Sequence, residues 1–258
     1  MLDIPSGQAH AILTEERRWL APGTVWAADF AEPPNPVDGL YEQILAARDL
    51  GSSYQIHWLP TPTGEARHAC DALGAAFRQR GAPLVAKSDN GSPFISGTFQ
   101  SLLERWNVVA LLSPPYTPWY NGAIEAGIGS NGTRTHYEAA RHGHPGYWTS
   151  DDLEAARLQS NTTARPWGAR GPTPQALWTQ RPPITPDERQ LFRYCLEHMH
   201  AQVLRELDLS TADLSDGDVR AVVARAATRR ALETLGYLCV RRKRITPPFN
   251  SHLRHIIT

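Results

Sequence analysis

Residues 24–30 read TVWAADF, a short apolar run that comes directly after the turn residues Pro22 and Gly23. A run of this length between turn residues predicts a buried β-strand. Asp29 interrupts the apolar pattern, and a carboxylate in or beside a buried strand is costly unless it is paired or binds a cation. The stretch therefore predicts an inner strand of a sheet and a first candidate site residue.

The sequence on both sides of this strand predicts an α/β fold. Further strands are expected at residues 40–49, 53–59, 83–88 and 108–112. Apolar side chains recur at helical spacing between and after them, at residues 63–80, 94–106, 122–141 and 151–160. Three strands in a meander, followed by alternating helices and strands, predict a mixed five-stranded sheet flanked by helices.

The 258 residues accommodate one large domain with a small appendage. We expect an N-terminal helix and linker over residues 1–23, a core over 24–184, and a small helical and basic region over 185–258. The N-terminal helix is predicted at residues 8–20, because a Pro-Gly pair follows it. The sequence holds no run of about 18 apolar residues, so it predicts no membrane span.

The net charge is zero, with 26 basic and 26 acidic residues, but the charges are unevenly distributed. Residues 219–258 hold nine basic side chains and one acidic side chain, whereas residues 185–218 hold three and eight. The basic segment is either a phosphate-binding surface or a solvated tail, and charge alone favours neither. Cys70, Cys195 and Cys239 lack the spacing of a disulfide framework or a metal site, which fits a reducing cytoplasm.

Two further acids have settings as distinctive as that of Asp29. Asp89 follows the strand at 83–88 and precedes an Asn-Gly turn, and Glu125 lies near the start of the helix at 122–141. Taken singly, each acid has an ordinary structural explanation: a satisfied strand end, a β-turn and a first-turn helix acid. Taken together, they form a set of hard oxygen donors that Mg²⁺ prefers, with positions left for water and phosphate.

Longer motifs surround the three acids. They are WAADF at residues 26–30, KSDNGSPF at 87–94 and SPPYTPWYNGAIEA at 113–126, with 35 residues between Asp89 and Glu125. The chain from about Thr24 to Trp178 resembles the DDE transposases and retroviral-type integrases, specifically the integrase-core transposases of bacterial insertion sequences. The resemblance implies a ribonuclease H-like fold, with Asp29 and Asp89 on neighbouring strands and Glu125 on the helix that faces them.

The same resemblance implies an enzyme that cuts and joins DNA. Asp29, Asp89 and Glu125 would be the catalytic residues and the ligands of two Mg²⁺ or Mn²⁺ ions. Water would nick the element end, and the freed 3′-hydroxyl would then attack target DNA by direct transesterification. The implied partners are the element ends, the target DNA and further copies of this chain in a homo-oligomer. Candidate DNA-binding residues are Lys87, Asn121, Arg134, Arg241, Arg242, Lys243 and Arg244.

Two departures from the resemblance leave a second function open. Gly129, Asn131 and Gly132 lie within the predicted catalytic helix, where an Asn-Gly pair is less favourable than good helix formers by about 1 kcal/mol or more. About two dozen residues precede the first core strand, too few for a helix-turn-helix region. That region is expected either on a separate chain or not at all in a truncated copy. The alternative function is a catalytically silent transposase remnant that only binds DNA or another partner.

Other functions receive less support from the sequence. A ribonuclease H-like nuclease or resolvase would use the same acids, but the loop at 113–126 argues against it. The sequence has no glycine-rich loop with Lys-Ser or Lys-Thr, so ATP use is not expected. The histidines form no metal-binding pattern with a cysteine pair, so we predict ordinary surface or core roles for His57, His68, His136, His142 and His144.

Overall fold

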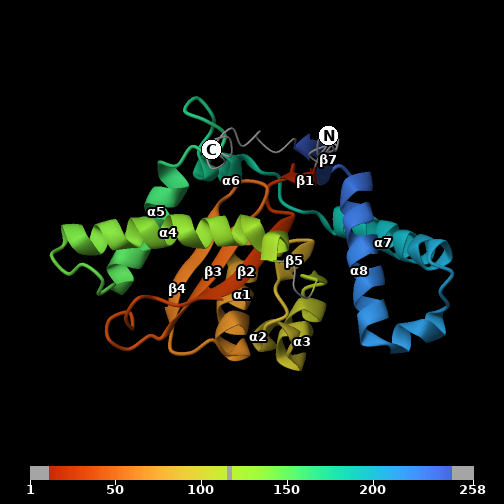
Figure 1. Cartoon of the computed structure of the whole chain (residues 1–258), viewed down its shortest axis with the longest axis horizontal. Helices are drawn as coiled ribbons and strands as arrows, with labels where there is room; N and C mark the ends of the chain where they lie inside the picture. Colours follow the sequence, from red (N-terminus) through yellow and green to blue (C-terminus); the bar gives the residue numbers. More distant parts are fainter. Residues whose placement is uncertain (1–11, 115–117, 246–258) are drawn as a thin grey trace, which may run out of the picture.

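The computed structural model describes residues 12–114 and 118–245, and its centre is a mixed five-stranded sheet (Figure 1). The strand order is β4-β3-β2-β5-β6. The bounds are β2 Val25–Ala31, β3 Gln43–Asp49, β4 Gln55–Thr61, β5 Val85–Ser88 and β6 Val109–Leu112. β2, β3 and β4 pair antiparallel, whereas β5 pairs parallel with both β2 and β6. The predicted fold class is therefore confirmed.

Helices cover both faces of this sheet. The bounds are α1 Ala66–Arg80, α2 Ser92–Ile95, α3 Gly97–Arg105, α4 Gly122–Arg141 and α5 Ser150–Thr162. Side chains of β2 alternate between the faces, as the two-residue period of a strand requires. Val25 and Ala27 lie in a core cluster with side chains of α4 and α5. Trp26 and Ala28 lie in a second cluster with side chains of α1, α2 and α3.

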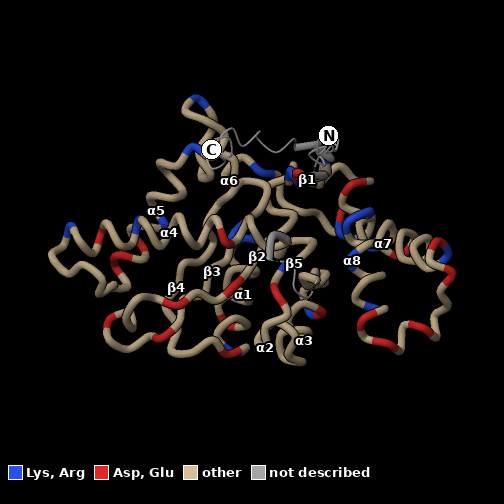
Figure 2. The backbone as a smooth tube through the Cα atoms, in the orientation of Figure 1, with Lys and Arg blue, Asp and Glu red and all other residues tan. Residues whose placement is uncertain are grey.

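The C-terminal helices pack onto the same sheet. Their bounds are α6 Pro174–Gln180, α7 Pro186–Glu206 and α8 Gly217–Thr234. Phe192 of α7 and Leu232 of α8 are buried in the cluster that contains Val25. Figure 2 shows acidic residues along the connection between α7 and α8 and basic residues on α8 itself. Within the described residues, none of the helices is both long enough and apolar enough to span a bilayer.

The prediction of an N-terminal helix at residues 8–20 is wrong, because residues 12–19 form a strand. β1 (Ile12–Trp19) pairs antiparallel with β7 (Leu238–Ile245), and Figure 1 shows the two together near the N-terminus. The partner strand lies at the other end of the chain, so local spacing could not reveal it. Pairing satisfies the backbone groups along the shared edge of the two strands, and Trp19 packs against the core cluster of β2 and α4. We call this pair of strands the β1–β7 ribbon.

Helix α4 is one continuous helix of 20 residues, so the glycines do not break it. A Cβ atom at Gly127 would lie 3.1 Å from the Arg48 side chain of β3, so a glycine there allows close packing of α4 onto the sheet. Asn131 is fully buried, and its side-chain oxygen accepts a hydrogen bond from the Ser160 hydroxyl of α5. The weak helix formers of α4 are therefore offset by tertiary contacts, which a propensity scale does not contain.

Candidate active site

The register of the sheet brings Asp29 and Asp89 to one edge. β2 and β5 are parallel neighbours, and Ala27 lies opposite Lys87 in the last registered pair. Asp29 lies two residues after Ala27, within β2. Asp89 lies two residues after Lys87, directly after the end of β5. Because side chains alternate, both acids follow Val25 and Val85 on the face covered by α4. The predicted placement of the two aspartates on neighbouring strands is confirmed.

Backbone N–H groups hold the two aspartates in position. Asp29 Oδ1 accepts a hydrogen bond from the Phe30 N–H over 2.8 Å, and Asp89 Oδ1 accepts one from the Gly91 N–H over 2.9 Å. A Cβ atom at Gly91 would lie 2.9 Å from Asp89 Oδ1, so only glycine leaves this carboxylate undisturbed. The Asn90 side chain donates to the Ser113 carbonyl, which ties the turn to the end of β6.

Glu125 reaches the same site from the opposite layer. It is an exposed acid in the first turn of α4, the helix that covers this face. Burial, together with the nearby carboxylates of Asp89 and Glu125, raises the pKa of Asp29 to about 6, although the Phe30 N–H and the charge of Lys87 act to lower it. The three acids thus interact electrostatically across two strands and a helix. That their carboxyl carbons lie within about 10 Å of one another stays a prediction.

An open cavity of about 500 Å³ lies in front of the two aspartates. Its lining includes Asp29, Asp89, Phe30, Gln43 and Glu65. Glu65 is a further acid that the sequence analysis did not single out. It directly precedes α1, and its carboxylate lies 3.0 Å from the Arg67 guanidinium. The cavity gives a phosphodiester access to the carboxylates from solvent.

Lys87 is buried beneath the loop that leads into α4. Its side chain is 4% exposed, and its ammonium donates hydrogen bonds to the Tyr120 carbonyl, over 2.8 Å, and to the Asn121 side-chain oxygen. The Ser113 hydroxyl lies 2.7 Å from that same oxygen. Burial lowers the pKa of Lys87 to about 7, with Arg17 acting in the same direction and Glu125 opposing it. Lys87 and Asn121 therefore fix the start of the helix that carries Glu125.

Basic side chains from distant parts of the chain surround Tyr120. The Arg17 guanidinium of β1 lies 4.5 Å from the Tyr120 ring centroid, and the Lys87 ammonium lies 4.4 Å from it. Arg229 of α8 lines a small cavity with the same three residues. Burial raises the pKa of Tyr120, while the positive charges of Arg17, Arg225 and Arg229 lower it. Sequence reasoning missed this basic group because its members come from three separate regions.

The other predicted DNA-binding residues lie away from the three acids. Arg134 is nine residues after Glu125 on α4, about 14 Å along the helix, and its guanidinium donates to the Ser130 carbonyl over 3.0 Å. Arg241 is exposed on β7, and the backbone of the next three candidates, Arg242, Lys243 and Arg244, continues the same strand. In the β1–β7 ribbon Glu16 lies opposite Arg241 and Glu15 opposite Arg242.

The fold and the placement of the three acids can be set beside known proteins. A mixed five-stranded sheet, with two aspartates at the ends of adjacent parallel strands and a glutamate on the covering helix, is the ribonuclease H-like arrangement that the sequence resemblance implied. Residues 20–118 match the family model described as "Integrase core domain", a segment that includes Asp29 and Asp89 and ends before Glu125. This part of the chain is therefore similar to the integrase core domain, and the match covers less than half of the chain.

Individual transposases are similar to part of this chain. Over 107 residues the chain is 29% identical to the transposase InsF of insertion sequence IS3A from Escherichia coli strain K12. That match covers 41% of this chain and 36% of InsF, so it spans little more than a third of the relative's length. The InsF transposase of insertion sequence IS3 from Escherichia coli O111:H- matches to the same extent.

Solved viral integrases share the fold at low sequence identity. A chain of the simian T-cell lymphotropic virus intasome, in complex with the PP2A regulatory subunit B56 gamma, aligns with a TM-score of 0.56 and 19% identity. The alignment covers 71% of this chain and 63% of that one. The HTLV-2 integrase catalytic core domain in complex with magnesium, in a trimeric form, aligns with a TM-score of 0.51 and 17% identity over 62% of this chain and 99% of that one.

Proposed function

We propose that this chain catalyses metal-dependent DNA strand cleavage and strand transfer during transposition. The observation that supports the proposal is the placement of Asp29 and Asp89 at the ends of adjacent strands, with Glu125 on the covering helix and near enough to raise the pKa of Asp29. The relatives that match over the core are transposases of insertion sequences by name. Phosphoryl transfer needs mainly positioning and neutralisation of charge, and a preorganised carboxylate set suits both.

The three acids fit a divalent cation. Burial and neighbouring negative charge raise the pKa of Asp29, so the ionised site is unfavourable until a cation neutralises it. We propose that Asp29, Asp89 and Glu125 hold Mg²⁺ or Mn²⁺, with two ions in the active state. When bound, such ions would supply Lewis acidity at the scissile phosphate. The chain's own part is to orient the carboxylates through Phe30, Gly91 and the Lys87–Asn121 contact.

DNA is the proposed substrate and partner. Arg134 lies on the same helix as Glu125, and the β1–β7 ribbon carries six basic residues, from Arg17 and Arg18 to the run 241–244, against Glu15 and Glu16. These are suited to contact DNA phosphates without reading sequence. We assign Lys87 and Asn121 to positioning α4 rather than to DNA. Structural neighbours were solved as an intasome and in trimeric and dimeric forms, which supports a homo-oligomer. We also propose that a helix-turn-helix on a separate chain recognises the DNA sequence.

The decisive experiment compares the wild type with Asp89→Asn in the presence of Mg²⁺ or Mn²⁺. The substrate is DNA that carries the ends of the element encoding the chain, and the readout is nicked and joined product. Asparagine can still accept the Gly91 hydrogen bond but removes the charge that holds the metal. We expect product from the wild type and none from Asp89→Asn. Equal product from both would indicate a contaminating nuclease, and product from neither, with DNA still bound, would favour the silent remnant.

A further inference from the structure

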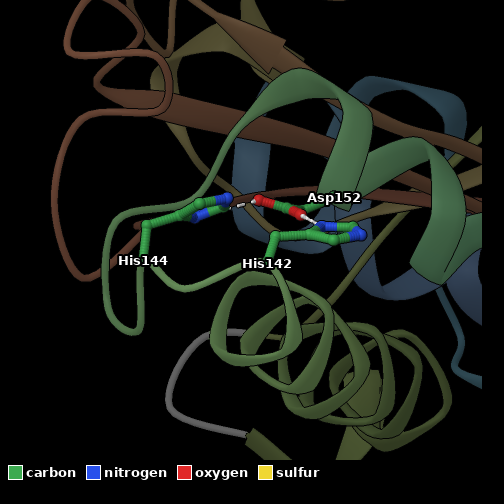
Figure 3. Close-up of side chains that lie close together, drawn as sticks. All are labelled: His142, His144 and Asp152. Atoms are coloured by element: carbon green, nitrogen blue, oxygen red, sulfur yellow. Dashed lines mark hydrogen bonds and ion pairs between the residues drawn. The ribbon is translucent and has the colours of Figure 1, made fainter.

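Two histidines and an aspartate meet where α4 ends and α5 begins, as Figure 3 shows. His142 caps the C-terminus of α4, His144 lies in the turn that follows, and Asp152 lies in the first turn of α5. One donor atom from each residue lies within 4.8 Å of the other two. The group lies at the opposite end of α4 from Glu125, so it is separate from the acidic site.

Asp152 is a fixed ligand whose two oxygens face one histidine each. The residue is fully buried, and its Oδ2 accepts hydrogen bonds from the Thr149 N–H and hydroxyl over 2.9 and 2.8 Å. Its Oδ1 lies 2.9 Å from His142 Nδ1. These contacts hold the carboxylate in a set orientation.

The histidine rings are open to solvent and adjustable. The side chains of His142 and His144 are 49% and 34% exposed, so an ion has a path to them. His144 Nδ1 lies 3.7 Å from Asp152 Oδ2 and 2.8 Å from the Tyr147 carbonyl. An ion bound at His144 Nδ1 would replace its contact with the Tyr147 carbonyl. Two imidazole nitrogens and one carboxylate oxygen are a ligand set typical of zinc.

We propose that His142, His144 and Asp152 form a zinc site that joins the end of α4 to the start of α5. Three protein ligands leave a fourth position for water in a tetrahedral site. Binding at His142 Nδ1 requires the imidazole tautomer with its proton on Nε2, so the contact between Nδ1 and Asp152 Oδ1 is replaced by two bonds to the ion and the neutral ring keeps its proton. Nitrogen donors favour Zn²⁺ over Mg²⁺, so this site and the all-carboxylate site are expected to select different ions.

The physical consequence of the site is a metal cross-link between two packed helices. α4 carries Glu125 and packs along α5, which packs on β4. A bound ion would hold the turn at 142–149 and so fix the far end of α4. Because binding to the folded form alone stabilises it, zinc should raise the thermal unfolding temperature of the chain.

The test measures zinc binding by titration calorimetry on the full chain, with Mg²⁺ in excess to occupy the acidic site. The variants are His142→Ala, His144→Ala and His144→Gln, and the control is His136→Ala, an exposed histidine on α4 outside the group. We expect the wild type and His136→Ala to bind one more equivalent of Zn²⁺ than the three variants. The zinc-dependent rise in unfolding temperature should likewise be lost in those variants only.

Two outcomes would overturn the site. The first is equal zinc binding by the wild type and all three variants, which would place the bound ion at other donors such as the cysteines. The second is no zinc binding by the wild type, in which case the three residues are a hydrogen-bonded latch only. The glutamine in His144→Gln can still donate a hydrogen bond to the Tyr147 carbonyl. If this variant binds Mg²⁺ like the wild type but no longer binds the additional Zn²⁺, the lost zinc binding is not due to unfolding.

Discussion

Replacing Lys87 by methionine should separate folding from catalysis. The Lys87 ammonium donates two hydrogen bonds at the start of α4, and a hydrogen bond from a charged group is worth about 1.5–3 kcal/mol. Burial opposes this gain, since it lowers the Lys87 pKa from 10.5 to about 7, a difference of roughly 5 kcal/mol between the charged and neutral forms. Methionine removes both contributions and keeps the length of the side chain.

The expected effects on stability and activity therefore differ. The two contributions to stability nearly cancel, so the free energy of unfolding should stay within about 2 kcal/mol of the wild type. The proposed activity depends on the position of Glu125. In the methionine variant the contact between Ser113 and Asn121 would remain to hold the start of the Glu125 helix, without the support of the lysine. We expect strand transfer to fall by about 10- to 100-fold, equivalent to roughly 1.4–2.8 kcal/mol of transition-state stabilisation.

A double-mutant cycle with Asn121→Ala tests the mechanism. If both residues act through one contact, the double variant should be little worse than either single variant, with a coupling of at least about 1 kcal/mol. Arg105→Met is the control, because Arg105 is an exposed cation on α3, on the other face of the sheet. Wild-type strand transfer by Lys87→Met would refute the reasoning, as would losses that simply add in the double variant.

Three further predictions follow from single contacts. Gly91→Ala should weaken Mg²⁺ binding about tenfold in calorimetry, since its Cβ would lie 2.9 Å from Asp89 Oδ1, while the unfolding temperature stays nearly constant because the backbone φ of −57° suits alanine. Burial lowers the pKa of His57 to about 4, so between pH 4 and 6.5 the unfolded chain binds more protons and the free energy of unfolding should rise with pH by about 1–3 kcal/mol. His57→Gln should lack that rise in denaturant titrations, and an equal rise in both proteins would exclude His57 as its source. Replacing the basic run of β7 by alanine should flatten the salt dependence of duplex binding by about 2 units rather than about 4, because Glu15 and Glu16 lie opposite two of its members. The residues replaced are Arg241, Arg242, Lys243 and Arg244. An unchanged slope would show that this run does not contact DNA.

The core of the fold and the acidic set were predictable because their signals are local. Apolar runs bounded by turns gave the five strands of the sheet, and the setting of each acid within or beside an element marked Asp29, Asp89 and Glu125. Strand alternation then makes the facing of the two aspartates a consequence of spacing. For these features the determining interactions lie within a few residues, so a linear reading of the sequence contains them.

Features that depend on contacts between distant segments were not predictable in this way. Residues 12–19 became a strand because β7 supplies a partner from the other end of the chain. Lys87 resembles a solvated strand-end lysine until the loop before α4 folds over it.

The sequence by itself determined which acids are candidates for the proposed chemistry, because side-chain type is fixed by the code and the elements that present these acids form from local pattern. Only the tertiary structure decided how those residues are supported. The Arg48 side chain packs closely against α4 at Gly127, and His142 and His144 lie next to Asp152 across a turn. In each case the decisive energy comes from burying or pairing groups on different elements of the fold, and no local propensity carries that information.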